Sequence, residues 1–236
     1  MMNKILSCIN KTKNQQSYKL SDIPKRLFQV SQIKNQIDIA VIDDQEFAPG
    51  QLLRNNNFKL TEIGDIPTLK NIEAFPIIIC DIHGVGKFFN SSEVGGANLI
   101  TEIRKAYPDK YIIAYSTHAN DLALQRHTKN SDYFMPIAST IEQWTEALEK
   151  ALYEISDPIT RWKKFRGFLL NNDVDLSEIY KLEQIYIEYF LRNNKKNINL
   201  EEKVSQLSVN DGLKQIIIQF TATAMVELAK TIFIES

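Results

Sequence analysis

The chain has 236 residues, 44% of them hydrophobic, so it can bury the core of one large domain or of two small ones. Cys8 and Cys80 are its two cysteines, and Cys80 falls in a predicted strand. This favours a small buried thiol in a reducing cytoplasm over a disulfide framework.

The apolar stretch at residues 5–9 is too short for a signal peptide. Charged residues interrupt the most apolar window, residues 216–234, which favours a buried helix over a membrane span.

The net charge of −1 hides an uneven distribution along the chain. Residues 1–36 carry seven basic residues and one acidic residue, whereas residues 37–156 carry ten basic and seventeen acidic residues. We interpret residues 1–36 as a basic N-terminal arm, which could dock on the acidic segment, bind nucleic acid or remain solvated.

The first predicted element is a helix inside this arm. Residues 1–17 are polar and are expected to be loose. Leu27, Val30 and Ile33 then recur at helical spacing, which predicts a helix over residues 20–36.

From residue 37 onward, short apolar runs alternate with segments of helical periodicity. Such alternation predicts right-handed βαβ units and a central parallel sheet, in a domain that spans residues 37–156. The predicted strands are residues 37–42, 58–63, 75–80, 111–115 and 131–135, and the predicted helices lie near residues 46–55, 66–72, 95–106, 119–129 and 140–154.

Asp157-Pro158 marks the boundary of a second domain, residues 157–236, in which no strand is predicted. Its apolar residues share helical faces, so an all-α domain is expected. The predicted helices lie near residues 158–171, 175–193, 199–207 and 209–234.

Acidic residues follow two of the predicted strands. Asp43 and Asp44 come directly after the first strand, and Asp81 comes directly after the third. Because parallel strands place their carboxyl ends at one edge of the sheet, we expect the three carboxylates to lie together there. Clustered carboxylates repel one another, and a hard divalent cation such as Mg²⁺ relieves the repulsion. A helix cap explains one of these acids, but not all three.

These acids and the later motifs, taken in order, resemble the receiver domain of response regulators. The resemblance covers about residues 36–155 and implies a flavodoxin-like (βα)5 doubly wound parallel sheet, followed here by an all-α domain. The later motifs are Gly96-x-x-Leu99-Ile100-x-x-Ile103-Arg104-x-x-Tyr107-Pro108, Ile112-Ile113-Ala114-Tyr115-Ser116 and Asp132-Tyr133-Phe134-Met135-Pro136.

The resemblance implies a phosphorylation site. Asp81 would be the phosphoacceptor, since a carboxylate can attack a phosphoryl donor and form an acyl phosphate. Asp43, Asp44 and Asp81, with the backbone carbonyl of His83, would hold Mg²⁺, which neutralises charge on the transferred group.

The resemblance also implies a conformational switch, with one departure from the family. Ser116 would bind the phosphoryl group through its hydroxyl, and Tyr133 would follow as the aromatic switch. The family has Lys before the proline of the fifth strand, whereas this chain has Met135, which offers neither charge nor hydrogen-bond donor. Lys87 or Lys129 could replace that cation from a nearby loop.

The function that follows is two-component-type signalling in a bacterial cytoplasm, with no enzymatic activity beyond self-catalysed phosphotransfer. A histidine kinase or phosphotransfer protein would supply the phosphoryl group, and residues 157–236 would bind a protein partner or form a homodimer. DNA binding is not favoured, and no membrane association is expected. A phosphate-independent adaptor is the main alternative.

Three further patterns admit a second interpretation. Asp81-Ile82-His83-Gly84-Val85 also resembles the first motif of haloacid-dehalogenase-type phosphatases, but His83 stands where that family has its second Asp. His83, His118 and His127 match no compact zinc motif and are interpreted as polar loop residues. Residues 161–166 interleave basic and aromatic side chains, which favours an amphipathic helix with a solvated basic face over a nucleic-acid site.

Overall fold

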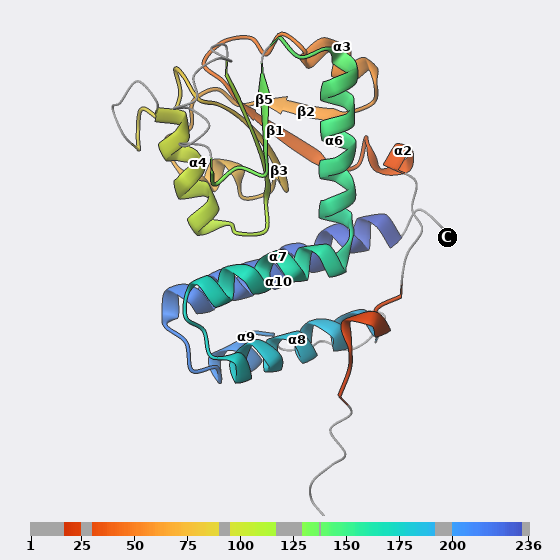
Figure 1. Ribbon diagram of the computed structural model, residues 1–236, viewed down its shortest axis with the longest axis vertical. Coiled ribbons are helices and arrows are strands. Elements are labelled where there is room, and N and C mark those ends of the chain that lie inside the picture. The colour runs from red at the N-terminus through yellow and green to blue at the C-terminus, as the bar shows by residue number, and fades with distance from the viewer. Residues whose placement is uncertain are drawn as a thin grey trace, which may run out of the picture.

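The computed structural model of the chain describes residues 17–24, 30–89, 95–116, 129–136, 138–191 and 200–232. An α/β domain and a group of helices stack along the long axis of the molecule (Figure 1). The predicted helix at residues 119–129, together with His118 and His127, lies outside the described residues apart from residue 129. Within the described ranges, no helix is both long and apolar enough to span a membrane.

The α/β domain is built on a five-stranded sheet of order β2-β1-β3-β4-β5, in which every pairing is parallel. This is the flavodoxin-like order, so the predicted fold class is confirmed. The strands are β1 (Asp38–Ile42), β2 (Lys59–Glu62), β3 (Ile77–Asp81), β4 (Tyr111–Ser116) and β5 (Tyr133–Pro136).

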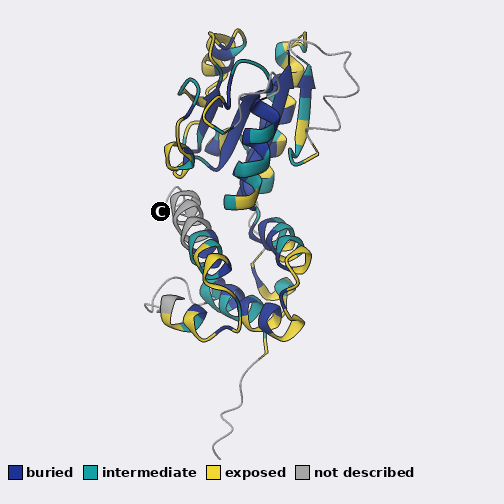
Figure 2. Ribbon diagram, turned by 90° about the vertical axis from the view of Figure 1, so that its left-hand side faces the viewer, coloured by how far each residue is buried: buried dark blue, intermediate teal, exposed yellow. Residues whose placement is uncertain are grey.

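Both faces of the sheet are covered in its centre, which is why the central strands β1, β3 and β4 are nearly continuous apolar runs. Alternate strand residues enter two separate cores: Ile39 packs on the side of α6 (Ile141–Ser156), and Ala40 on the side of α4 (Gly95–Ala106). The central strands are accordingly buried along most of their length (Figure 2). The shorter elements that complete these layers are α2 (Val30–Ile33), α3 (Gly50–Asn55) and the 3₁₀ helix η2 (Leu69–Ile72).

The predicted helix at residues 20–36 is not continuous in the described residues. A 3₁₀ turn, η1 (Leu20–Asp22), is followed by Ile23 in an extended conformation, because Pro24 disfavours the helical conformation of the residue before it. Ile23 packs in the core of the C-terminal helices, whereas Ile33 in α2 packs in a core of the sheet. The described parts of the N-terminal arm therefore contact both halves of the molecule.

Beyond the sheet domain, the described residues are helical, as predicted. Asp157 ends α6 and caps the next helix, since its carboxylate accepts a hydrogen bond from the backbone N–H of Thr160 at 2.9 Å. Phe165 and Phe220 stack at 3.9 Å between ring centroids in the shared core. The helices are α7 (Pro158–Asn171), α8 (Leu176–Leu191), α9 (Leu200–Ser205) and α10 (Asp211–Ile232).

One buried and one half-buried charge pair join α7 to the sheet domain. Arg161, only 2% exposed, contacts Asp109 at 2.6 Å, and Lys164 contacts Asp132 at 2.6 Å. The predicted solvated basic face is therefore wrong for Arg161 and Lys164. Asp109 and Asp132 lie just before β4 and β5, so the helices dock at the amino-terminal edge of the sheet, opposite the edge at which Asp81 ends β3.

Candidate functional site

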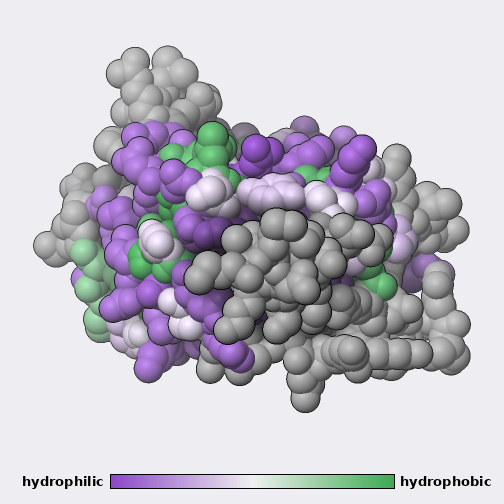
Figure 3. Space-filling model, turned by 90° about the horizontal axis from the view of Figure 1, so that it is seen from below, coloured by the Kyte–Doolittle hydropathy of each residue, from purple (hydrophilic) through white to green (hydrophobic). Residues whose placement is uncertain are grey.

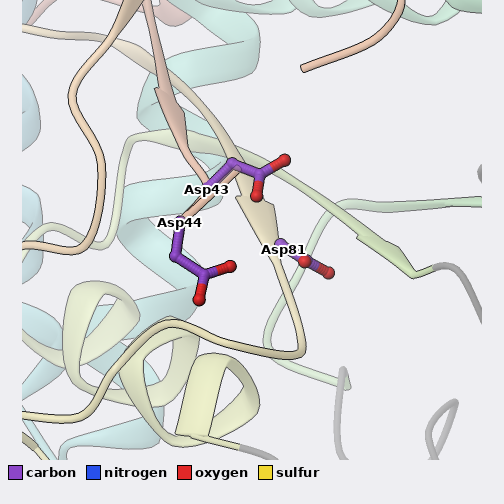
Figure 4. A group of neighbouring side chains, drawn as sticks. All are labelled: Asp43, Asp44 and Asp81. Carbon is purple, nitrogen blue, oxygen red and sulfur yellow. The ribbon is translucent and has the colours of Figure 1, made fainter. Parts of the chain in front are cut away.

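Three carboxylates meet at the carboxyl-terminal edge of the sheet, as the sequence predicts. Asp43 and Asp44 follow β1, Asp81 is the last residue of β3, and these two strands are paired neighbours. One oxygen from each side chain lies within 4.8 Å of the other two. Figure 4 shows the three side chains at the ends of their strands. Asp81 is buried, Asp43 is half-buried and Asp44 is exposed, so the cluster is closed at its base and open to solvent on one side.

The surroundings of Asp81 disfavour its negative charge. Burial raises the pKa of the Asp81 carboxyl to about 6, and the nearby charge of Asp43 adds to this effect. Hydrogen bonds from the backbone N–H groups of His83, at 3.2 Å, and Ile82, at 2.7 Å, act in the opposite direction without outweighing the burial. A bound cation would compensate the charge that burial leaves unfavourable.

The donor set fits Mg²⁺. All three side chains are carboxylates, and hard oxygen ligands are those that Mg²⁺ prefers. His83, whose backbone carbonyl the sequence also assigned to the metal, lies two residues after Asp81, and its backbone N–H donates a hydrogen bond to Asp81 Oδ1. The structure thus brings together the three carboxylates that the sequence assigned to the metal.

Close backbone packing holds the loop after β3 against the acids. Gly84 has a φ of +72°, and a Cβ atom on this residue would lie 2.2 Å from Asp44 Oδ1. A Cβ atom on Gly96 would lie 2.0 Å from the backbone oxygen of Asp81. Gly96 is therefore required by its close approach to the backbone, and Gly84 by its positive φ, which L side chains rarely adopt; single-residue patterns in the sequence reveal neither.

A lysine reaches the cluster from the same loop. The Nζ atom of Lys87 lies 3.2 Å from Asp44 Oδ2. The backbone N–H groups of Gly86 and Lys87 donate to Asp65 at 2.7 Å and 3.1 Å, so Asp65 fixes the loop that carries the lysine. Asp65 was not predicted as a site residue, and its position three residues after the end of β2 was the available signal in the sequence.

Tyr115 is a second residue that the sequence analysis missed as part of the site. Its hydroxyl donates a hydrogen bond to the carboxylate of Asp43. Its side chain is 2% exposed, and burial raises the pKa of the phenol well above its ordinary value, so the hydroxyl stays protonated at physiological pH. The signal in the sequence was a polar aromatic residue at the end of an apolar strand, directly before Ser116.

The remaining predicted residues lie on β4 and β5. Ser116 is buried one residue beyond Tyr115, the residue that pairs with Asp81 across the sheet. Tyr133 begins β5 and is 39% exposed, with Lys150 Nζ 5.9 Å from its ring centroid. Met135 is buried in the core on the α6 side, so its side chain adds neither charge nor a hydrogen-bond donor at the acids.

Comparisons with known proteins identify structures but no sequence family. No protein-family model and no curated protein matches the chain. Among solved structures, the chain is similar to a CheY-like response regulator receiver domain from Methanospirillum hungatei, with 16% identity, a TM-score of 0.41, and coverage of 50% of this chain and 94% of that one. It is also similar to the receiver domain of NtrX from Brucella abortus, with 21% identity, a TM-score of 0.42, and coverage of 49% and 98%. A putative pilus assembly-related protein from Burkholderia pseudomallei matches with 14% identity, a TM-score of 0.42, and coverage of 55% and 96%.

Proposed function

We propose that this chain is a two-component-type signalling protein whose sheet domain accepts a phosphoryl group on Asp81. The observation that carries the proposal is the convergence of Asp81 with Asp43 and Asp44 at the carboxyl-terminal edge of the sheet, with the Lys87 ammonium beside them. A buried carboxylate next to two acids and a cation is suited to act as a nucleophile toward phosphorus when a metal ion offsets the charge.

In the proposed reaction, a carboxylate oxygen of Asp81 attacks the phosphorus of a small acyl phosphate or of a phosphohistidine in a kinase or phosphotransfer protein. The bond from phosphorus to the leaving group breaks, and an acyl phosphate remains on Asp81. Asp43, Asp44, Asp81 and the carbonyl of His83 would hold Mg²⁺, which neutralises negative charge on the phosphoryl group. No other catalytic activity is proposed.

Lys87 has a specific role in the proposed phosphotransfer. Met135 occupies the position where receiver domains have a lysine, and its side chain lies in the core. Lys87 Nζ is already 3.2 Å from one of the acids, on a loop that Asp65 holds in place. We propose that its ammonium contacts the incoming phosphoryl group in place of the missing lysine.

The helical domain would transmit the signal. Phosphorylation would favour one arrangement of Ser116, Tyr133 and the adjoining helix, a shift between two populations. Because α6 leads directly into α7, a displacement of α6 would reach the helices. The surface at the helical end carries hydrophobic residues in small groups among hydrophilic ones (Figure 3). Residues 157–236 are proposed to bind a protein partner or a second copy of the chain.

Metal-dependent labelling tests this function. The full chain would be incubated with acetyl phosphate, with and without Mg²⁺, and the modified peptide would be located by mass spectrometry. The proposal predicts Mg²⁺-dependent labelling of the peptide that contains Asp81, strongly reduced in Asp44→Asn. Labelling elsewhere, or labelling that ignores Mg²⁺, would contradict it.

The burial of Met135 also favours a second candidate function, a phosphate-independent adaptor that binds a partner through its helices. Such a protein would keep the acids, and its affinity for the partner would be the same in wild type and in the Asp81→Asn variant. Binding that requires phosphodonor and Mg²⁺ would exclude the adaptor.

A further inference from the structure

Tyr115 joins the acidic cluster to a group of aromatic rings in the core. Its hydroxyl donates to Asp43 Oδ2, while Asp43 Oδ1 accepts a hydrogen bond from the backbone N–H of Gln45 at 2.8 Å. Both oxygens of the Asp43 carboxylate are therefore engaged by the protein. Since a carboxylate oxygen has two lone-pair sites, each oxygen can still bind a cation while it accepts its hydrogen bond.

The ring of Tyr115 is itself held on two sides. It meets Phe47 edge to face, with ring centroids 5.4 Å apart, and Trp144 in the same way at 5.9 Å. Phe47 and Trp144 also contact each other at 5.1 Å, so the three rings form a closed, buried group. Such packing fixes the rotamer of Tyr115, and with it the direction in which the hydroxyl points.

We infer that Tyr115 is a positioning residue that sets the orientation of the Asp43 carboxylate toward a divalent cation. The inference rests on the proposed function, because it assumes that a cation binds at the three acids. Hydrogen-bond partners that orient metal ligands contribute strongly to metal affinity, and their removal costs about 10- to 100-fold in many sites. The phenol suits this role because its ring is anchored in the core while its hydroxyl reaches the cluster.

The same contact gives the cation a route to α6. Trp144 lies on α6 and packs on the ring that holds Asp43. A cation bound by the Asp43 carboxylate would change the hydrogen bond that this carboxylate accepts from the Tyr115 hydroxyl. Because the Tyr115 ring packs on Trp144, the surroundings of the indole would change as well. Mg²⁺ binding should therefore change the fluorescence of Trp144.

The test compares the wild-type chain with Tyr115→Phe and a matched control, Tyr111→Phe. Tyr111 lies on the same strand and in the same core, but its buried hydroxyl has no hydrogen-bond partner in the described residues. Mg²⁺ affinity would be measured by calorimetry, and tryptophan emission would be followed during the same titration. Trp144→Phe identifies which of the two tryptophans responds.

Tyr115→Phe is expected to weaken Mg²⁺ binding by about 10-fold or more and to lose the change in emission. Tyr111→Phe is expected to match wild type in both, and Trp144→Phe to bind Mg²⁺ without the change. Tyr115→Leu, a second variant without the hydroxyl, should repeat the loss of affinity. Wild-type affinity in Tyr115→Phe would overturn the inference and leave the proposed function intact. A wild-type chain that binds no Mg²⁺ would overturn the metal site and the inference together.

Discussion

Replacing Asp81 by Asn should stabilise the metal-free protein at neutral and alkaline pH. Burial, reinforced by the charge of Asp43, raises the pKa of this carboxyl from 3.8 to about 6. Asn keeps an oxygen that can accept the hydrogen bonds from the backbone of Ile82 and His83, and it carries no charge. The substitution therefore removes an unfavourable charge while it preserves the local contacts.

The pH dependence has a definite sign. With its pKa raised in the folded state, Asp81 binds more protons in the folded chain than in the unfolded chain between about pH 4 and pH 6. Its contribution to stability consequently falls as the pH rises through this window, and the loss is complete above the folded-state pKa. Two pKa units correspond to about 3 kcal/mol. Because the cluster opens to solvent at Asp44, screening reduces the expected cost to about 1–2 kcal/mol.

Urea denaturation in the presence of EDTA measures this effect. We expect Asp81→Asn to exceed wild type in free energy of unfolding by about 1–2 kcal/mol at pH 8, with the difference gone below about pH 4. The exposed acid is the control, and Asp44→Asn should change stability by less than about 0.5 kcal/mol. If Asp81→Asn were less stable than wild type at pH 8, or if the difference did not vary with pH, the electrostatic reasoning would be refuted.

Three further substitutions test separate parts of the structure. Lys87→Gln should slow acyl phosphate formation by about 10-fold or more, measured as the initial rate with a small phosphodonor. The exposed control Lys105→Gln should leave this rate unchanged. Equal rates in wild type and Lys87→Gln would show that Lys87 takes no part in the reaction. Asp109→Ala should lower the free energy of unfolding in urea by about 3–5 kcal/mol, because it removes a carboxylate that is ion-paired with the buried Arg161. A loss below about 1 kcal/mol would show that this pair does not hold the interface. Gly167→Ala should raise the free energy of unfolding by up to about 1 kcal/mol, because Ala favours the helix more than Gly and a Cβ atom at this position of α7 meets nothing within 4 Å. A loss of stability would contradict this packing.

The central strands of the sheet domain could be predicted because they are buried on both faces and appear as nearly uninterrupted apolar runs. The predicted strands at residues 75–80 and 111–115 differ from β3 and β4 by at most two residues at either end. The meeting of Asp43 and Asp44 with Asp81 followed from the same pattern, since adjacent parallel strands end at one edge. These features depend on local sequence and on a general rule of topology.

One local signal in the sequence was misjudged, and the other features that the sequence did not reveal depend on contacts between distant residues. The helix predicted over residues 20–36 is interrupted at Ile23, because Pro24 disfavours the helical conformation of the residue before it. The prediction gave more weight to the apolar periodicity than to this proline. Arg161 was interpreted as solvated because its partner, Asp109, lies 52 residues away in the chain. Tyr115 reads as a core residue of a strand, and only the fold brings its hydroxyl to Asp43, 72 residues earlier.

The most direct test of the phosphoacceptor is the intact mass of the protein after incubation with acetyl phosphate and Mg²⁺, compared with Asp81→Asn. Our account predicts that wild type gains one phosphoryl group and that the variant gains none. A wild-type mass that stays unchanged while Mg²⁺ binds would contradict the account, since the acids would then hold a cation without serving phosphotransfer.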